Sequence, residues 1–275
     1  MTRLGLSYAQ KQSYPTPTAV VEGGLLPLVA TTGGPMTTPG WSGHWRGRQP
    51  AGDIHYRARE VVRSTGGIVR GKFPSRKNGR MIHHEGLLEL DAIYHFETSP
   101  CIARYREQVA TIHYADGARL RRYTPDFELH LTSGDLVLVE IKPEAMLSDP
   151  DTLHKFNRVA EHFERAAQAF EIVTDIVIRA EPRMTNLRTI YQRASRVPMT
   201  DEAMSAIANR YRHLFPMTIG QSTEMMRRGG ITPYCLLLAD LVRCALTQPL
   251  VDATPLYVSE EPNHATLLSQ KRLGF

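Results

Sequence analysis

An aspartate, a glutamate and a lysine within residues 123–143 have a spacing that could support phosphodiester hydrolysis. Asp126 begins an alternating apolar and polar stretch, which is typical of a half-buried strand. After a turn, an apolar run predicts a buried strand ending in Glu140 and Lys142, whose side chains share one face. Two carboxylates can hold Mg²⁺ through hard oxygen ligands, and a lysine can help to activate water and offset phosphate charge.

The order Pro-Asp, thirteen residues, Glu-x-Lys resembles the signature of the PD-(D/E)xK nuclease superfamily. Asp126 and Glu140, with the carbonyl of Ile141, would then ligate one Mg²⁺, for which Mn²⁺ could substitute, and Lys142 would contact the water or the scissile phosphate. The alternative is an edge hairpin with solvated charges. Four apolar residues before Glu140 argue against it, because they predict an interior strand.

The elements around this hairpin predict an α/β domain. Residues 84–96 have the apolar periodicity of a helix, on which Glu85 and Glu89 share a face, so either could supply a third carboxylate or be solvated. Strand-like stretches follow at 102–109 and 111–114. An amphipathic helix at 152–170 and a strand at 171–179 complete a core of the restriction-endonuclease type. On that helix His154 and Lys155 either approach phosphate or are surface residues.

Basic residues are concentrated before the predicted helix, in a glycine-interrupted segment that predicts a loop over most of 57–80. The segment could contact DNA phosphates or be a solvated basic loop. The candidate DNA-contacting residues are Arg70, Lys72, Arg76, Lys77 and Arg80.

Composition changes divide the chain into four parts. We expect an irregular, proline-rich N-terminal arm over 1–60, in which Trp41 and Trp45 could stack on bases, anchor a partner or fasten the arm to the fold. The nuclease domain spans 61–182 and a mostly helical, winged-helix-like domain spans 183–260, followed by a basic tail over 261–275. In the third part the sequence predicts helices at 187–195, from a Thr200 cap to 213, and through 234–246, then a β-wing over 246–258.

The ordered motifs in the first half resemble the N-terminal catalytic domain of TnsA, the endonuclease subunit of heteromeric cut-and-paste transposases. The resemblance covers roughly 71–175 and lies in the segments GLLELDAIYHFETSPCIARYREQ, RRYTPDFELH and LVEIKP. It places the family's helical acid on Glu89 rather than Glu85, its aspartate on Asp126 and its lysine on Lys142. Glu140 stands where some relatives have glutamine. Gln108 either supports the substrate strand or is structural.

The resemblance implies a Mg²⁺-dependent DNA endonuclease that cuts the 5′ strand at transposon ends. A TnsB-like transposase would cut and join the 3′ ends, and a TnsC-like AAA+ ATPase would contact the C-terminal region. Two alternatives remain: a stand-alone restriction or repair nuclease, and a catalytically silent DNA- or protein-binding scaffold. Keeping Glu89, Asp126, Glu140 and Lys142 together argues against the scaffold.

Charge and composition agree with an intracellular role. The 275 residues have a formal charge of +5, which is compatible with a polyanionic partner. The three cysteines are widely spaced and suggest neither a zinc site nor a disulfide framework. No apolar run reaches the length of a membrane span, and no signal peptide is recognisable. We therefore expect a soluble bacterial cytoplasmic protein that is nucleoid-associated when bound to DNA.

Overall fold

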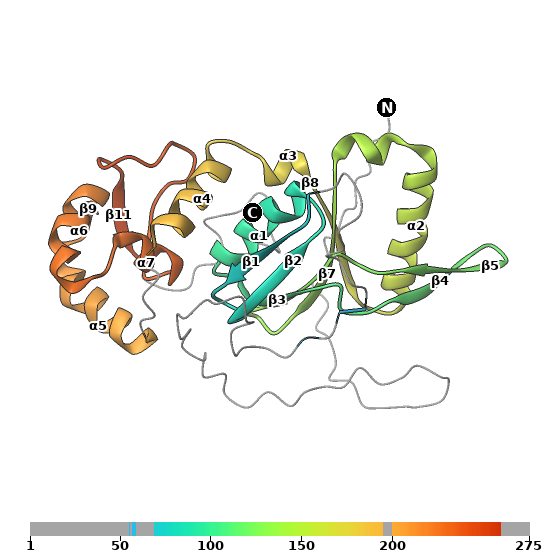
Figure 1. Cartoon of the computed structure of the whole chain (residues 1–275), viewed down its shortest axis with the longest axis horizontal. Helices are drawn as coiled ribbons and strands as arrows, with labels where there is room; N and C mark the ends of the chain where they lie inside the picture. Colours follow the sequence, from blue (N-terminus) through green and yellow to red (C-terminus); the bar gives the residue numbers. More distant parts are fainter. Residues whose placement is uncertain (1–54, 56, 59–68, 195–199, 260–275) are drawn as a thin grey trace. The chain divides into compact units, whose positions relative to one another are not determined.

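A mixed four-stranded sheet forms the centre of the structure, a computed structural model that describes residues 55, 57–58, 69–194 and 200–259 (Figure 1). All of these lie in one compact unit, Thr38–Phe275. The order of the sheet is β3-β6-β7-β8, antiparallel except for the parallel pair β7 and β8. The strands are β3 (Ile102–Glu107), β6 (Phe127–Leu131), β7 (Leu136–Lys142) and β8 (Ala169–Thr174). The predicted hairpin and its interior second strand are therefore confirmed.

The sheet is covered by one helix on each face, which explains the sequence pattern of β7. Helix α1 (Leu87–Thr98) packs with Phe127, Leu129 and Val139 in the main core. Helix α2 (Pro150–Arg165) packs on the other face and connects β7 to β8. Because β7 is covered on both faces, its residues 136–139 form a continuous apolar run instead of an alternating one.

A β-hairpin occupies residues 71–84, so the prediction of a basic loop is wrong for the part of 57–80 that begins at residue 71. Strand β1 (Gly71–Ser75) pairs with β2 (Arg80–His84). Phe73 and Ile82 face each other across the hairpin and are buried in the main core, and this burial outweighs the local charge. Gly71 has no space for a side chain, because a Cβ there would lie 2.5 Å from Nε2 of His84.

A second hairpin, β4 (Ile112–Asp116) with β5 (Arg119–Tyr123), forms a two-stranded sheet of its own. A turn joins the two strands, and in it Gly117 adopts a φ of 60° that favours glycine. The return strand β5 is present in the structure but was not predicted from the sequence. Buried Tyr114 and Tyr123 pack this hairpin onto α2.

The C-terminal part has a separate apolar core around short helices and a small sheet. The helices are α4 (Arg183–Arg193), α5 (Asp201–Tyr211), α6 (Ile219–Met226) and α7 (Pro233–Leu238), with 3-10 turns η2 (Arg212–Leu214) and η3 (Arg227–Gly229). Two short elements belong to the first part instead: the 3-10 turn η1 (Glu144–Ser148) follows β7, and α3 (Asp175–Ile178) packs in the main core through Ile178. The sheet order is β10-β11-β9, from β9 (Met217–Thr218), β10 (Val242–Arg243) and β11 (Pro255–Val258). The winged-helix assignment and the domain boundaries stay predictions.

The predicted helix through 234–246 is too long. Helix α7 ends at Leu238, and Asp240 adopts a φ of 54° as the chain turns into β10. Both parts of the apolar run are buried in the C-terminal core, Leu236 from the helix and Val242 from the strand, so apolar content alone could not separate them. The Thr200 cap is confirmed, since its hydroxyl accepts a hydrogen bond from the Ala203 N–H.

The predicted arm over 1–60, with Trp41 and Trp45, lies outside the described residues apart from 55, 57 and 58, and the predicted tail over 261–275 lies outside them entirely. Within the described residues, the structure contains no helix with both the length and the apolar character needed to span a bilayer.

Candidate active site

Asp126 lies immediately before β6, where the chain approaches the end of β7. Phe127 pairs with Val139, so Asp126 occupies the next rung, beside Glu140. Its Oδ2 accepts a hydrogen bond of 2.8 Å from the backbone N–H of Ile141. In a strand the N–H and carbonyl of one residue point to the same side, so the Ile141 carbonyl is directed toward the strand that carries Asp126.

Glu140 is buried at the end of β7 and is held by two side chains. Its Oε1 accepts a hydrogen bond from Nζ of Lys142 at 3.2 Å, and its Oε2 accepts one from the Tyr123 hydroxyl at 2.7 Å. The Glu140 side chain is only 5% exposed, whereas the Lys142 side chain keeps 26% of its surface accessible. Lys142 can therefore reach both the carboxylate and a molecule entering from solvent.

Glu89 extends from the first turn of α1 toward Asp126 and Glu140. Its Oε2 accepts a hydrogen bond of 2.8 Å from the backbone N–H of Glu85. Its charge is close enough to Asp126 to raise the pKa of that carboxyl group. The structure therefore brings Glu89, Asp126, Glu140 and Lys142 to one edge of the sheet, from three different elements.

The electrostatics of this edge favour a bound cation. Burial raises the pKa of Asp126 well above its usual range, and the negative charges of Glu140 and Glu89 raise it further. The Ile141 N–H and Lys142 offset part of this effect. Among the described residues no three His, Cys, Asp or Glu side chains are already arranged as a metal cage. The carboxylate oxygens nevertheless have the donor chemistry that Mg²⁺ prefers, and a divalent ion would relieve their repulsion.

Gln108 supports Asp126 through its backbone. The Gln108 N–H donates to the Asp126 carbonyl at 2.9 Å, and the Gln108 carbonyl accepts from the Ala58 N–H at 2.8 Å. Gln108 is buried and has a φ of 47°, which marks the end of β3. These backbone contacts fit the structural alternative for Gln108.

Two of the five predicted DNA-contacting residues point into the fold. Arg80 is buried and donates to both carboxylate oxygens of Glu107 at 2.9 and 2.7 Å. Lys77 donates to three backbone carbonyls near the end of α1, and burial lowers its pKa to about 8. Arg76 donates to the Ala194 carbonyl and lies over the Tyr191 ring.

These contacts explain why the positive charge of this segment does not by itself indicate contact with DNA. Arg80 neutralises buried Glu107, and Lys77 satisfies carbonyls at a helix end, where a cation is favoured. Lys72 is exposed and Arg70 is half-buried. A DNA-contacting role for the segment stays a prediction that depends mainly on Lys72 and Arg70. His154 is engaged with Asp116, and Lys155 lies over the rings of Tyr123 and Phe156.

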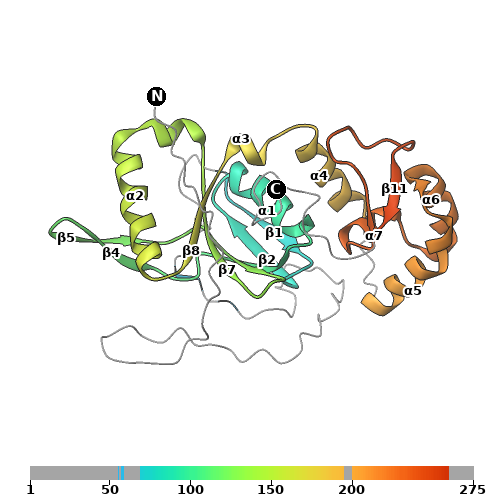
Figure 2. The ribbon, with the colours of Figure 1, turned by 180° about the vertical axis from the view of Figure 1, so that it is seen from behind.

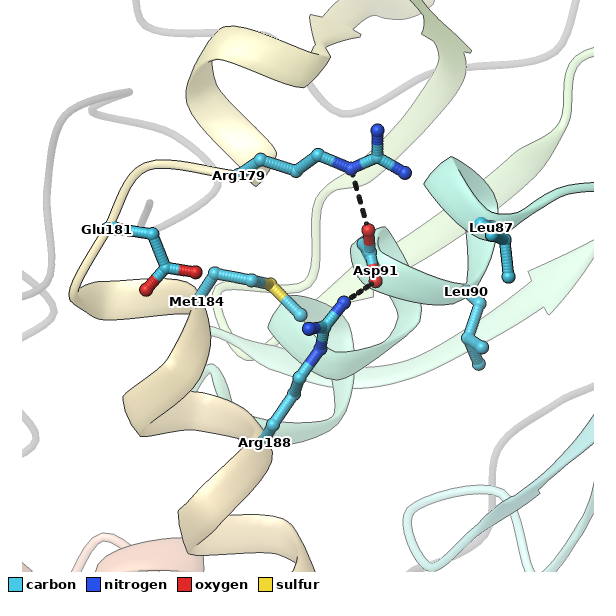
Figure 3. Close-up of a pocket in the computed structure, with 7 residues that line it drawn as sticks. All are labelled: Leu87, Leu90, Asp91, Arg179, Glu181, Met184 and Arg188. Carbon is cyan, nitrogen blue, oxygen red and sulfur yellow. Dashed lines mark hydrogen bonds and ion pairs between the residues drawn. The ribbon is translucent and has the colours of Figure 1, made fainter.

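The described cavity lies elsewhere, between α1 and the segment that leads into α4 (Figure 3). Its volume is about 280 Å³, and none of the four candidate site residues lines it. Buried Asp91 accepts hydrogen bonds there from Arg179, at 2.8 Å, and from Arg188. Asp91 is two residues from Glu89 on the same helix, so the two carboxylates point to different sides of α1. We interpret this cluster as a connection between α1 and α4.

A central sheet whose interior strand ends in Glu-x-Lys, beside an aspartate from the next strand and a glutamate from a covering helix, is the arrangement of a PD-(D/E)xK-type nuclease. Comparison with protein families agrees: residues 99–175 match the family described as TnsA-like endonuclease N terminal. The match over this segment supports a TnsA-like nuclease in a transposition context. The match contains Asp126, Glu140 and Lys142, whereas Glu89 precedes it. A comparison with curated proteins found no match.

Tyr123 and the arginines before it have no role in the predictions from sequence. The signal was present in the string RLRRY, which combines a short strand pattern with three positive charges and ends three residues before Asp126. Only the fold shows that Tyr123 contacts Glu140, because seventeen residues separate them in sequence.

Proposed function

We propose that this protein is a Mg²⁺-dependent DNA endonuclease that cleaves the 5′ strand at transposon ends as one subunit of a heteromeric cut-and-paste transposase. The observation that carries the proposal is the convergence of Asp126, Glu140 and Lys142 within a TnsA-like endonuclease segment. A TnsB-like transposase would act on the 3′ strand, and a TnsC-like ATPase would contact the C-terminal helices.

Each residue has a distinct task in this proposal. Asp126, Glu140 and the Ile141 carbonyl would hold one Mg²⁺, with Glu89 completing that site or recruiting a second ion. The bound ion would supply charge neutralisation at the phosphate and lower the pKa of the attacking water. Lys142, fixed by Glu140 at 3.2 Å, would orient that water or contact the scissile phosphate.

Calorimetric titration with Mn²⁺ tests the metal site directly. Asp126→Asn keeps an acceptor for the Ile141 N–H but removes the charge, and Glu140→Gln does the same beside Tyr123. We expect both variants to lose Mn²⁺ binding. Asp135→Asn is the matched control, because Asp135 is an exposed residue in the turn of the same hairpin. Equal binding by all four proteins, or none by the wild type, would support the silent scaffold instead.

Strand mapping then tests the place of the cut. Plasmid carrying the transposon ends is incubated with Mg²⁺, the protein and its partner transposase, and each strand is labelled separately. We expect nicks on the 5′ strand at each end, which disappear with Glu140→Gln. Cleavage of plain DNA by the isolated protein would identify a stand-alone nuclease.

A further inference from the structure

The β4–β5 hairpin, defined as residues 112–123, is an exposed basic ribbon beside the candidate active site. It does not join the central sheet, and Figures 1 and 2 both show it extending beyond α2. Four of the five residues of β5 are exposed: Arg119, Leu120, Arg121 and Arg122. The exposed side chains of this strand pack against no hydrophobic core among the described residues. Its surface is therefore available to a partner.

The two faces of the ribbon differ. One face carries Tyr114 and Tyr123, which are buried against α2. On the other face Arg122 pairs with His113 and Leu120 pairs with Ala115, and all four are exposed. Leu120 is 71% exposed. The inner face attaches the base of the ribbon to the domain, while the outer face remains open. Arg119 pairs with Asp116 on the inner face, but it lies next to the turn, where it is exposed.

The positive charge of the ribbon is only partly balanced. Asp116, the single acid in 112–123, contacts Arg121 at 2.5 Å and His154 at 2.8 Å. Arg119 and Arg122 form no ion pair with any of the described residues. Two guanidinium groups are thus left to bind an anionic partner, and guanidinium is well suited to phosphate.

The ribbon is connected to the catalytic edge through its last residue. Tyr123 ends β5 and donates to Oε2 of Glu140 at 2.7 Å, so the base of the ribbon is fixed at the candidate metal site. Arg119 lies four residues away, which corresponds to roughly 13 Å along a strand. At ~3.4 Å per nucleotide of one strand, this length spans about four base pairs of duplex DNA.

We propose that the β4–β5 ribbon binds the phosphate backbone of duplex DNA flanking the cleavage site, through Arg119 and Arg122. The inference rests on the proposed nuclease function and identifies the surface that holds its substrate. The direction of the ribbon sets where the duplex lies relative to Glu140, because Tyr123 fixes one end of it. Phosphate contacts of this kind fix register and orientation without reading sequence.

Fluorescence anisotropy tests the proposed contact with DNA. It measures the binding of a short DNA duplex to the full chain over a range of salt concentrations, without divalent metal. We expect Arg119→Ala/Arg122→Ala to weaken binding roughly tenfold and to reduce the slope of log Kd against log salt by about 2, one unit for each lost phosphate contact. Arg119→Lys/Arg122→Lys should retain most of the slope, because the charge is kept.

The matched control removes the same charge elsewhere. Arg165→Ala/Arg227→Ala changes two exposed arginines outside the ribbon and should leave the slope nearly unchanged. An unchanged slope in the ribbon variant, an equal loss in the control, or no DNA binding by the wild type would overturn the proposal. Mn²⁺ calorimetry on the same variants separates the two hypotheses: the ribbon variant should bind Mn²⁺ like wild type, whereas absent Mn²⁺ binding with normal DNA binding would refute the nuclease function alone.

Discussion

The Tyr123 hydroxyl donates a hydrogen bond of 2.7 Å to Oε2 of Glu140, and both side chains are almost completely buried. The Tyr123 ring is surrounded by Phe156, Phe163 and Phe170, which meet it edge to face. Burial, together with the nearby Glu140 charge, raises the pKa of Tyr123 far above its ordinary value, so the hydroxyl remains a donor. A rigid phenol thus orients a candidate metal ligand.

Tyr123→Phe should weaken metal binding while preserving the fold. The substitution keeps the packed ring and removes the hydroxyl group that donates to Oε2 of Glu140. Loss of an outer partner of a metal ligand typically reduces affinity by about 10- to 100-fold. We expect a decrease of this size in Mn²⁺ affinity by calorimetry, with an altered electron paramagnetic resonance spectrum of the remaining bound Mn²⁺.

Tyr114→Phe is the control for that experiment. Tyr114 is buried in the same cluster beside α2, on the strand paired with β5. Its variant should bind Mn²⁺ like the wild type, and both variants should unfold cooperatively. Equal Mn²⁺ affinity in the Tyr123 and Tyr114 variants would show that Tyr123 serves packing only.

Glu107→Gln should destabilise the protein strongly. Burial acts to raise the pKa of Glu107, but the hydrogen bonds from Arg80 and the charges of Arg80 and Arg57 outweigh it, so the pKa is lowered. The substitution leaves Arg80 as a buried charge without its carboxylate, which costs about 3–5 kcal/mol in comparable pairs. Urea denaturation at neutral pH measures the loss.

Asp91→Asn provides a comparison between two arginine-carboxylate clusters. Asp91 is buried, but the side chains of its partners Arg179 and Arg188 are 49% and 43% exposed, so water can solvate both after the substitution. We expect a smaller loss of unfolding free energy than for Glu107→Gln, with faster hydrogen exchange in α4. A larger loss in the Asp91 variant would contradict this ranking.

His95 should make the stability sensitive to acid. Burial lowers its pKa to about 4, with a further contribution from the Arg183 charge, while the Ile178 carbonyl at 2.7 Å and the Asp91 charge act in the opposite direction. The His95 side chain binds a proton more readily in the unfolded chain than in the folded protein. The stability that neutral His95 contributes is therefore fully present above about pH 6.5 and is lost as the pH falls toward 4. The His95 contribution amounts to about 3 kcal/mol across this window.

Urea denaturation of His95→Gln at several pH values tests this contribution. Glutamine cannot titrate but retains a donor for the Ile178 carbonyl. The variant should therefore lose less stability than wild type between neutral pH and pH 4. His213→Gln changes an exposed histidine and should follow the wild type. Parallel pH profiles for wild type and the His95 variant would refute the prediction.

The sequence by itself determined the β6–β7 hairpin at the candidate active site. Strands β6 and β7 are adjacent in the chain, their pairing is antiparallel, and their apolar pattern sets which residues face the core. With that register, Asp126 and Glu140 must lie opposite each other, one rung beyond the pair Phe127 and Val139. The apolar run before Glu140 likewise indicated a strand covered on both faces.

The tertiary structure alone decided which charged residues are internal. Arg80 and Lys77 look like solvated residues until Glu107 and the end of α1 are placed beside them, and those partners are some 20 or more residues away in sequence. The contact between Tyr123 and Glu140 depends in the same way on how the β4–β5 ribbon packs against α2. Local hydrophobic periodicity predicts the pairing of strands that are neighbours in the chain. The partner of a buried polar group depends instead on long-range packing, which no short sequence pattern predicts.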